Sequence, residues 1–514
     1  MFKDLKTKKL LPIITLLALL ISYALLLAHP INLVTADLGR HIKNGEMIWQ
    51  GNFEVLKTNF YSYTYPDFPA TNHHWLSGLI FYGLWQLVGF KGLGLFFILT
   101  SLATLFLFFR IAVAKSFPAI ATLVAIPLLP LLLERNEIRP EIFSYLLAGI
   151  FFWLILKIKA GQINPKYLFI LPVLQIVWTN LHIYFFVGLI LIGTFLIEAL
   201  IQKSHLIKKL SLTLLFSVIA TAVSPFGINS TLAPLTIFKN FGYRLAENQP
   251  VWFIENILPS PNFLIFKIVF LVLILSLIAR IWHLRSCRTL TTDIIFTLGF
   301  SLAGWLAIRN FAIFGLFALP LIAGNLARLF KPKPETVRWL GHTAVTTLIL
   351  IILIILSGEF RTIYSRAQDL GLGLESGNIQ ALEFFKENNI TGPIFNNYDI
   401  GGYLIFGLPD KKKVFTDNRP EAYPTEFFEK TLIPMQEDED VWNEKNSLYK
   451  FNAIIFSYRD YTPWGQTFFA RILNDPEWKI VFADKRVVVL LKNNELNKKI
   501  IEKYGQSLKI KIAN

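Results

Sequence analysis

A charged stretch, "TADLGRHIKNGE" at residues 35–46, follows closely on the first apolar run of the chain. It contains Asp37, with Arg40 and His41 three and four positions later, a spacing that places all three on one face of a helix. The carboxylate of Asp37 has two alternative uses. It can cap the N-terminus of a helix, or it can act as a general base that takes the proton of an attacking hydroxyl. Arg40 and His41 either bind a phosphate or pair with Asp37.

Two adjacent histidines stand in the stretch "TNHHW" at residues 71–75. His73 and His74 either anchor the chain at a membrane–water interface or donate hydrogen bonds to a sugar or a phosphate. A metal site is the weaker interpretation, because zinc needs three or four ligands and the sequence spaces no further ligands suitably. We therefore predict these histidines as substrate-binding residues and predict no metal ligands.

A third group of charges lies in "ERNEIRPE", residues 134–141. Arg135 and Arg139 are four positions apart, so a helix would let both guanidinium groups grip one phosphate. Mutual ion pairing within the stretch is the alternative. His182 ends the stretch "WTNLH", and Arg309 begins "RN". A lone arginine at the end of a membrane span is usually an interfacial anchor, but here several polar groups recur at such ends.

The composition indicates an integral membrane protein. Of the 514 residues, 54% are hydrophobic, whereas soluble domains are about 45–50% apolar. The net charge of +15 does not indicate nucleic-acid binding, because lysine and arginine concentrate in the cytoplasmic loops of membrane proteins. Cys287 is the single cysteine of the sequence, which excludes an intrachain disulfide.

The apolar runs predict an α-helical polytopic membrane protein with about eleven transmembrane helices. With the N-terminal lysines in the cytoplasm, basic loops alternate with loops that carry most of the acids, which obeys the positive-inside rule. This orientation places the C-terminal part and all the candidate site residues named above outside the cytoplasm. The predicted spans are residues 10–28, 92–114, 117–133, 142–158, 167–180, 183–201, 210–224, 263–281, 293–308, 311–330 and 340–357.

The remaining segments complete the predicted organisation. Residues 1–357 form a transmembrane domain with a first outer loop at 36–75, and residues 358–514 form an extracytoplasmic soluble α/β domain. We expect a juxtamembrane helix at about 38–50, and we expect "WLSGLIFYGLWQLVGF" after the loop to lie along the membrane interface. In the tail, helix-like stretches at 378–389, 425–435 and 465–475 alternate with strand-like runs at 392–397, 403–406, 413–417, 453–457, 479–484 and 486–492.

Several of these stretches together resemble one protein family. "DLGRHIKNGEMI", "NFYSYT" and "NHHWLSGLIFYGLW" are similar to the first outer loop of bacterial membrane proteins of the GT-C glycosyltransferase superfamily. "IRPEIFSYLL", "WTNLHIYFFVGLILIG", "SPFG" and "RNFAIFGL" resemble later blocks of the same family, and "NNYDIGGYLIFGLP" and "KVFTDNRPEAYP" resemble its outer C-terminal domain. The likeness spans most of the chain in the same order. More remotely, it extends to protein O-mannosyltransferases and lipid A aminoarabinose transferases.

The resemblance implies an inverting hexosyl- or pentosyltransferase of the cytoplasmic membrane that moves a sugar from a polyprenyl-phosphate-linked donor to a glycan, lipid or protein acceptor outside the cytoplasm. The acidic residue of the first outer loop, here Asp37, would be the base. Basic residues at outer span ends, here Arg135, Arg139, His182 and Arg309, would hold the lipid phosphate. No cofactor is certain, and a divalent cation stays open. The sequence has His74 where the family pattern has an acid.

Two other functions remain as alternatives. A transporter of envelope glycan precursors would place charges or broken helices near the middle of the membrane, whereas the charges here gather at the ends of the apolar runs. A non-catalytic membrane scaffold would keep the fold and present the soluble domain. The soluble domain, with "GGYLIF" and "TDNRPEAYP", either caps the substrate groove or binds the acceptor. The alternative for Asp417, Arg419 and Glu421 is an ordinary turn with internal ion pairs.

Overall fold

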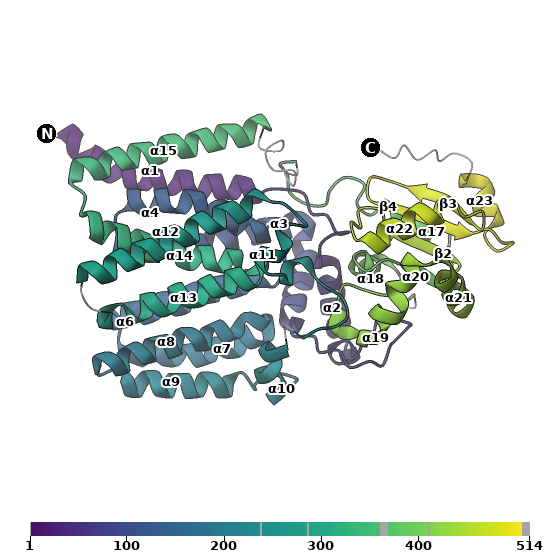
Figure 1. Ribbon diagram of the computed structural model, residues 1–514, viewed down its shortest axis with the longest axis horizontal. Helices are drawn as coiled ribbons and strands as arrows, with labels where there is room; N and C mark the ends of the chain where they lie inside the picture. Colours follow the sequence, from purple (N-terminus) through teal and green to yellow (C-terminus); the bar gives the residue numbers. More distant parts are fainter. Residues whose placement is uncertain (1, 237–238, 285–286, 360–368, 410–411, 506–514) are drawn as a thin grey trace. The chain divides into compact units, whose positions relative to one another are not determined.

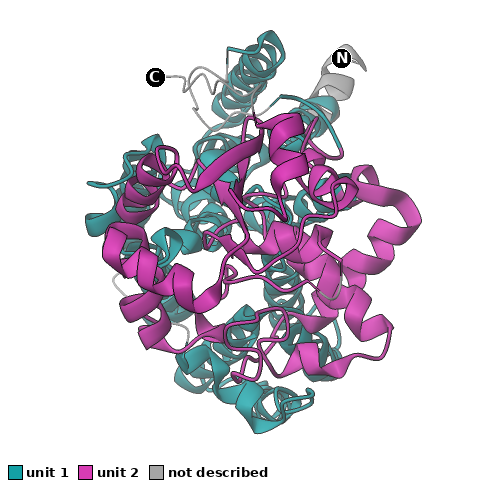
Figure 2. Ribbon diagram, turned by 90° about the vertical axis from the view of Figure 1, so that its right-hand side faces the viewer, with its two compact units in different colours: residues 1–30, 94–238, 245–372 teal, residues 31–93, 239–244, 373–514 magenta. Residues whose placement is uncertain are grey.

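The computed structural model describes residues 2–236, 239–284, 287–359, 369–409 and 412–505, with side chains from Leu10 onward. The side chains of the N-terminal lysines, on which the predicted orientation partly depends, lie outside this description. The chain divides into two compact units (Figure 2). Unit 1 comprises residues 1–30, 94–238 and 245–372, and unit 2 comprises residues 31–93, 239–244 and 373–514.

Unit 1 consists of helices that lie side by side (Figure 1). α1 packs on α15 and α4, α14 packs on α12 and α13, and α8 packs on α6, α9 and α13. Short 3-10 segments connect several of them, among them η3 (Leu133–Arg135), η5 (Ile183–Phe185), η7 (Ala246–Asn248) and η9 (Ile308–Asn310). The α-helices are α1 (Phe2–Leu27), α4 (Pro118–Ala125), α5 (Leu129–Leu132), α6 (Glu141–Lys159), α7 (Ile170–Leu181), α8 (Phe186–Gln202), α9 (Ile207–Ala220), α10 (Ile228–Leu232), α11 (Val251–Ile254), α12 (Pro261–Leu284), α13 (Thr291–Leu306), α14 (Phe311–Phe330) and α15 (Pro334–Ser357).

Within the described residues, nine helical segments are long and apolar enough to cross a membrane. The chain is therefore a multi-pass membrane protein, with fewer such segments than the eleven predicted. The predicted spans at 167–180 and 210–224 correspond to α7 and α9, which have 12 and 14 residues. α7 ends early because His182 adopts an extended conformation, with φ −160° and ψ 144°.

The segment predicted as an interfacial helix after the first loop is helical and forms the beginning of the long helix α3 (Trp75–Lys115). Its position at the membrane interface stays a prediction. Gly89 interrupts α3 with φ 62° and ψ −168°, a backbone conformation in which a side chain would be strained. α3 therefore consists of two helical parts, and the first belongs to unit 2.

Aromatic side chains from four helices form the core of unit 1. Phe317 on α14 stacks on Phe300 of α13 with ring centroids 3.9 Å apart, and on Phe152 of α6 at 5.3 Å. Phe108 of α3 meets the edge of Phe317 at 5.1 Å. These rings are buried, and aromatic pairs of this kind stabilise beyond the area they bury.

Unit 2 contains a four-stranded sheet of order β1-β2-β4-β3 (Figure 1). β1 and β2 are parallel, and the other two pairs are antiparallel. β2 and β4 are buried along nearly their whole length, which explains why "AIIFS" and "RVVVLLK" are continuous apolar runs. The elements are α2 (Leu38–Trp49), α17 (Gln380–Glu387), β1 (Ile394–Asn396), α18 (Gly401–Gly407), α19 (Thr425–Phe427), the π-helix η11 (Phe428–Leu432), α20 (Pro434–Glu437), α21 (Glu439–Tyr449), β2 (Ala453–Ser457), α22 (Pro463–Ile472), β3 (Trp478–Ala483), β4 (Val487–Lys492) and α23 (Lys498–Tyr504).

Two of the predicted strands are wrong. The run "YLIF" lies in helix α18, and "KVFTD" forms a single bridge between Val414 and Ser62. Short apolar runs do not distinguish a strand from a buried helix. Here the glycines before the run favour close helix packing: a Cβ added at Gly401 would lie 2.3 Å from the Cα of Asp417.

The first outer loop is an integral part of unit 2. The Leu33 N–H donates to the Asn378 side chain at 3.0 Å, and the Tyr63 hydroxyl donates to the Ile394 carbonyl at 2.9 Å. Ser62 and Val414 form a parallel bridge. The domain limits predicted from the apolar runs describe membrane topology, which the structure does not test, and they differ from the limits of the compact units.

Candidate functional site

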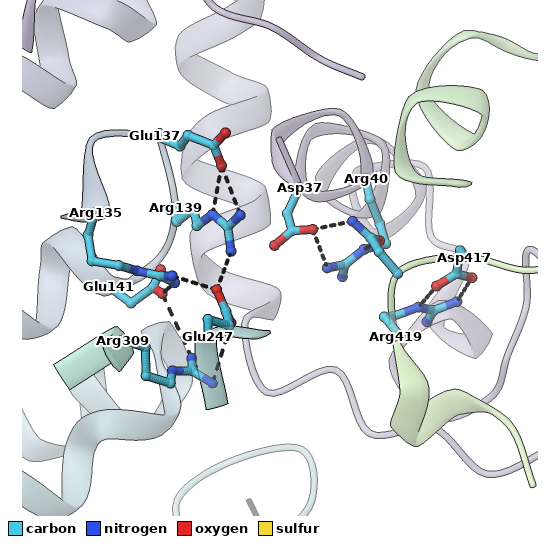
Figure 3. Close-up of polar contacts among 11 residues, drawn as sticks. Asp37, Arg40, Arg135, Glu137, Arg139, Glu141, Glu247, Arg309, Asp417 and Arg419 are labelled. Carbon is cyan, nitrogen blue, oxygen red and sulfur yellow. Dashed lines mark hydrogen bonds and ion pairs between the residues drawn. The ribbon is translucent and has the colours of Figure 1, made fainter. Parts of the chain in front are cut away.

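Asp37 lies directly before helix α2 in unit 2 (Figure 3). Among the described backbone N–H groups at the start of α2, none donates a capping hydrogen bond to its side chain. Its Oδ1 instead accepts a hydrogen bond from Asn418 Nδ2 and lies 3.7 Å from Arg40 Nη2. Arg40 Nε in turn donates to Asn418 Oδ1 at 3.1 Å. One fifth of the Asp37 side chain is exposed, so an oriented carboxylate reaches the surface of unit 2.

The predicted histidines of unit 2 lie near one another, with His41 buried and His73 and His74 half-buried. The rings of His41 and His74 meet edge to face, with centroids 5.7 Å apart, and His41 also packs against Phe81. Burial lowers the pKa of His73 to about 4, so its imidazole is neutral at pH 7. A neutral His73 can donate a hydrogen bond to a sugar or a phosphate oxygen, but it adds no positive charge to a phosphate site.

The stretch "TDNRPEAYP" contains a buried ion pair. Arg419 donates from Nε and Nη2 to the two carboxylate oxygens of Asp417, each at 2.7 Å (Figure 3). Asn59 and Tyr423 also contact this pair, at 2.9 and 3.3 Å. Asp417 has no exposed surface. The structure therefore shows the internal ion pair that was one of the two predicted roles of Asp417 and Arg419. Asn418 between them holds Asp37.

Asp399, which follows β1, is a carboxyl group with an unusual proton affinity. Its side chain reaches solvent, yet protein atoms crowd it, and the negative charges of Asp460 and Asp37 add to this effect. Together they raise the pKa of Asp399 from 3.8 to about 7. The folded protein therefore binds more protons than the unfolded chain between about pH 4 and 7, and this group makes folding less stable as the pH rises through that window.

We expect the Asp399→Asn variant to lose this contribution. Wild type should lose stability relative to the variant as the pH rises from 4 to 7, and the difference should be constant above pH 8. Urea unfolding of the purified protein at pH 4.5, 6 and 8 measures it. A difference between the two proteins that is independent of pH would contradict the raised pKa.

The predicted arginines of unit 1 form a cluster of ion pairs, which we call the arginine cluster (Figure 3). Its members are Arg135, Glu137, Arg139, Glu141, Glu247 and Arg309. Arg135 ends the 3-10 segment η3, whereas Arg139 lies in the loop before α6. The two therefore do not share a helix face, contrary to the expected geometry. Both nevertheless contact the same carboxylate oxygen, Oε2 of Glu247.

Glu247 was not among the predicted site residues. Arg135 Nη1 and Arg139 Nη1 lie 2.5 and 3.3 Å from its Oε2, and Arg309 Nη1 lies 3.7 Å from its Oε1. Burial opposes its ionisation, but the three guanidinium groups outweigh burial and lower the pKa of Glu247 to about 2. In the sequence, the only indication of Glu247 was its place among the acids of a predicted outer loop. Asn418, which was also not predicted as a site residue, appeared only as part of the motif "KVFTDNRPEAYP".

His182 lies in unit 1 and connects α7 to η5. Its Nδ1 accepts a hydrogen bond from the Tyr184 N–H at 3.4 Å. Ser144 Oγ accepts from Trp178 Nε1 and donates to His182 Nδ1, both at 2.8 Å. Because Nδ1 is an acceptor, His182 carries its proton on Nε2. The Tyr184 hydroxyl donates to Asn310 at 2.7 Å, so the longer stretch "WTNLHIYFFVGLILIG" meets "RN".

Replacing Ser144 by alanine should leave both Trp178 Nε1 and His182 Nδ1 without this partner. We expect the variant to lose about 1–3 kcal/mol of unfolding free energy, the cost of unpaired buried polar groups. Ser116→Ala is the matched control, because Ser116 bonds only to the carbonyls of its own helix end, and it should change stability by less than about 0.5 kcal/mol. Denaturant unfolding in detergent measures both variants, and equal losses would contradict the prediction.

Metal binding was left open in the sequence. Within the part of the chain that the structure describes, His, Cys, Asp and Glu side chains form no group of three or more that could hold a metal ion.

Comparisons with known proteins agree with this architecture. No protein-family model matches the sequence, and no curated protein matches it. In structure, the chain is similar to the archaeal oligosaccharyltransferase AglB from Archaeoglobus fulgidus in complex with an inhibitory peptide and a dolichol-phosphate, with a TM-score of 0.57 and 12% identity over 94% of this chain and 74% of that chain.

Two further structures of the A. fulgidus oligosaccharyltransferase are similar as well. The apo form gives a TM-score of 0.54 and 13% identity, over 86% of this chain and 69% of that one. The complex with Zn and sulfate gives 0.53 and 14%, over 93% and 73%. At these identities the likeness concerns the fold alone. It confirms the predicted fold class: the chain has helices long and apolar enough to span a membrane and a C-terminal domain built on a small sheet, the fold of these oligosaccharyltransferase structures.

Proposed function

We propose that this protein is a membrane glycosyltransferase that moves a sugar from a polyprenyl-phosphate-linked donor to an acceptor at the outer face of the cytoplasmic membrane. The observation that carries the proposal is the Asp37 carboxylate, which Asn418 and Arg40 orient and which remains one fifth exposed. A GT-C type fold with an oriented acid in its first outer loop supports this reaction class over others. Sidedness rests on the positive-inside rule.

In the proposed reaction, the acceptor hydroxyl oxygen attacks the anomeric carbon of the donor sugar. The bond from that carbon to the phosphate oxygen breaks, the polyprenyl phosphate leaves with the electron pair, and the anomeric configuration inverts. Asp37 takes the hydroxyl proton as the new bond forms, which is the work of a general base. Asn418 and Arg40 are positioning residues, because they hold the Asp37 carboxylate.

The donor's phosphate is the second part of the proposal. Arg135, Arg139 and Arg309 would bind it, because guanidinium groups match phosphate oxygens in geometry and charge. They would also stabilise the negative charge that develops on the leaving phosphate. His182 carries its proton on Nε2 and offers a further donor, and in the other unit Arg40, His41, His73 and His74 are proposed to bind substrate.

The scaffold function is the second candidate, and one observation favours it. Each arginine of the arginine cluster already contacts at least one glutamate, as in a purely structural network. Transfer of radiolabelled sugar distinguishes the two candidates. Membranes that contain the full chain should transfer label from a series of polyprenyl-phosphate sugars, and matched membranes without it should not. Well-inserted protein that transfers label from none of these donors would favour the scaffold.

A further inference from the structure

Glu247 receives contacts from all three guanidinium groups of the arginine cluster (Figure 3). Arg135 and Arg139 approach one of its oxygens, and Arg309 approaches the other. A carboxylate that offers two oxygens to converging guanidinium groups is recognised in the same way as two oxygens of a phosphate. Glu247 therefore lies where an anionic ligand of these arginines would bind.

The three acids of the cluster are held differently. Glu141 begins helix α6, and its side chain is only 6% exposed. Glu137 contacts Arg139 from a loop and does not bridge the arginines in the described contacts. Glu247 stands on the three-residue segment η7, its side chain is 27% exposed, and residues 244–250 around it are all exposed or half-buried. A short segment that is exposed or half-buried opens at a lower free energy than a core helix, so η7, although hydrogen-bonded to η9 through Asn248 and Arg309, can release its carboxylate.

The charges of the cluster constrain what could replace Glu247. Three arginines face three glutamates, so the six side chains carry no net charge. Departure of Glu247 alone would leave one uncompensated positive charge in a partly buried place, which is unfavourable. A phosphodiester carries one negative charge and restores neutrality, whereas a diphosphate brings an excess of negative charge next to Glu137 and Glu141.

We propose that the Glu247 carboxylate occupies the phosphate-binding position of the arginine cluster until the phosphate of the lipid-linked donor displaces it. One negative charge then replaces another. The cluster therefore prefers phosphodiester lipids to diphosphate lipids. The identity of the donor in this inference rests on the proposed function. Displacement itself does not, because it concerns the binding of a lipid phosphate and needs no sugar transfer.

Binding of short isoprenyl probes to the full-length protein in lipid nanodiscs tests the proposal. Glu247→Gln keeps the side-chain size and removes the competing charge. It should bind methyl farnesyl phosphate about tenfold more tightly than wild type, because the carboxylate no longer occupies the arginine cluster in most molecules. Glu255→Gln is the matched control. Glu255 belongs to the same connection between α9 and α12 and pairs with Lys267 at 2.5 Å, and this variant should change affinity by less than about twofold.

Two other probes complete the measurement. Farnesol, which has no phosphate, should bind all three proteins equally. Farnesyl diphosphate should bind wild type more weakly than methyl farnesyl phosphate does. Unchanged or weaker binding of methyl farnesyl phosphate to Glu247→Gln would overturn the displacement, and tighter binding of the diphosphate would overturn the preference.

Hydrogen exchange of the wild-type protein provides a test that does not depend on a variant. Adding methyl farnesyl phosphate should accelerate exchange of the backbone N–H groups of residues 246–249, because η7 is released, and slower or unchanged exchange would overturn the proposal. Together with the transfer assay, this measurement distinguishes failure of the displacement from failure of the proposed function. Absent transfer with accelerated exchange refutes the proposed function alone, and active transfer with slowed exchange refutes the displacement alone.

Discussion

Asp37→Asn should lower sugar transfer by at least about 100-fold, the smaller end of what a general base contributes. Asparagine keeps the shape of the side chain and can still accept the hydrogen bond that Asn418 donates to Oδ1 in wild type. It cannot take a proton from the acceptor hydroxyl. The measurement compares initial rates of label transfer in membranes that contain equal amounts of inserted wild-type and variant protein.

Asp67→Asn is the control for the Asp37 variant. Asp67 lies in the same loop and is exposed, so its replacement removes the same charge from the same region, and transfer should stay within about twofold of wild type. If Asp37→Asn transferred label as fast as wild type, the base would be another residue, although the reaction class would stand. Equal losses in both variants would indicate an effect of loop charge.

Asp417→Asn should destabilise the protein by about 3–5 kcal/mol, the usual cost of breaking a buried ion pair. The guanidinium of Arg419 would keep its charge in a buried place and lose its anionic partner, with only neutral contacts left: the amide oxygen of the new side chain, Asn59, and the face of the Tyr61 ring 5.8 Å away. Pulse proteolysis of the full chain across a urea series measures the loss, because cleavage follows the unfolded fraction.

The double variant Asp417→Leu with Arg419→Met tests whether the loss comes from the unpaired charge. Replacing both partners with apolar residues of similar volume removes the charge and the pair together, and this is often nearly neutral in stability. We therefore expect the double variant to be more stable than Asp417→Asn. If the double variant were the less stable of the two, hydrogen bonds to Asn59 and Tyr423 would matter more than charge.

The sequence correctly predicted the strands that are rich in β-branched and apolar residues. It missed elements whose structure depends on contacts with distant residues. "AIIFS" and "RVVVLLK" are rich in β-branched and apolar residues, and both are strands. "YLIF" has a similar composition, yet it is helical, and Gly401 before it allows α18 to pack closely on residues 416 and 417. That contact joins positions about fifteen residues apart, which local patterns do not reveal.

The candidate site shows the same limit. The sequence placed Arg40 on the Asp37 face of a helix, and the structure shows them 3.7 Å apart. It could not supply Asn418 or Glu247, because Asn418 meets Asp37 across 381 positions and Glu247 meets Arg135 across 112. Charge and spacing predict which side chains can reach the ends of helices, whereas the partner that each one meets is decided by tertiary packing.

Unit 2 is built from stretches that are far apart in the sequence, and this affects how it can fold during synthesis. Residues 31–93 leave the ribosome long before residues 373–514, with which they share hydrogen bonds such as Leu33 to Asn378. From residue 93 to residue 373 are 280 positions (373 − 93), which take about 14–56 s at about 5–20 residues per second. During that time the loop that carries Asp37 is held between membrane segments without its partner strands. A chain stalled or cleaved before residue 373 would expose the apolar side of this loop, and such truncated chains should be substrates for envelope chaperones and proteases.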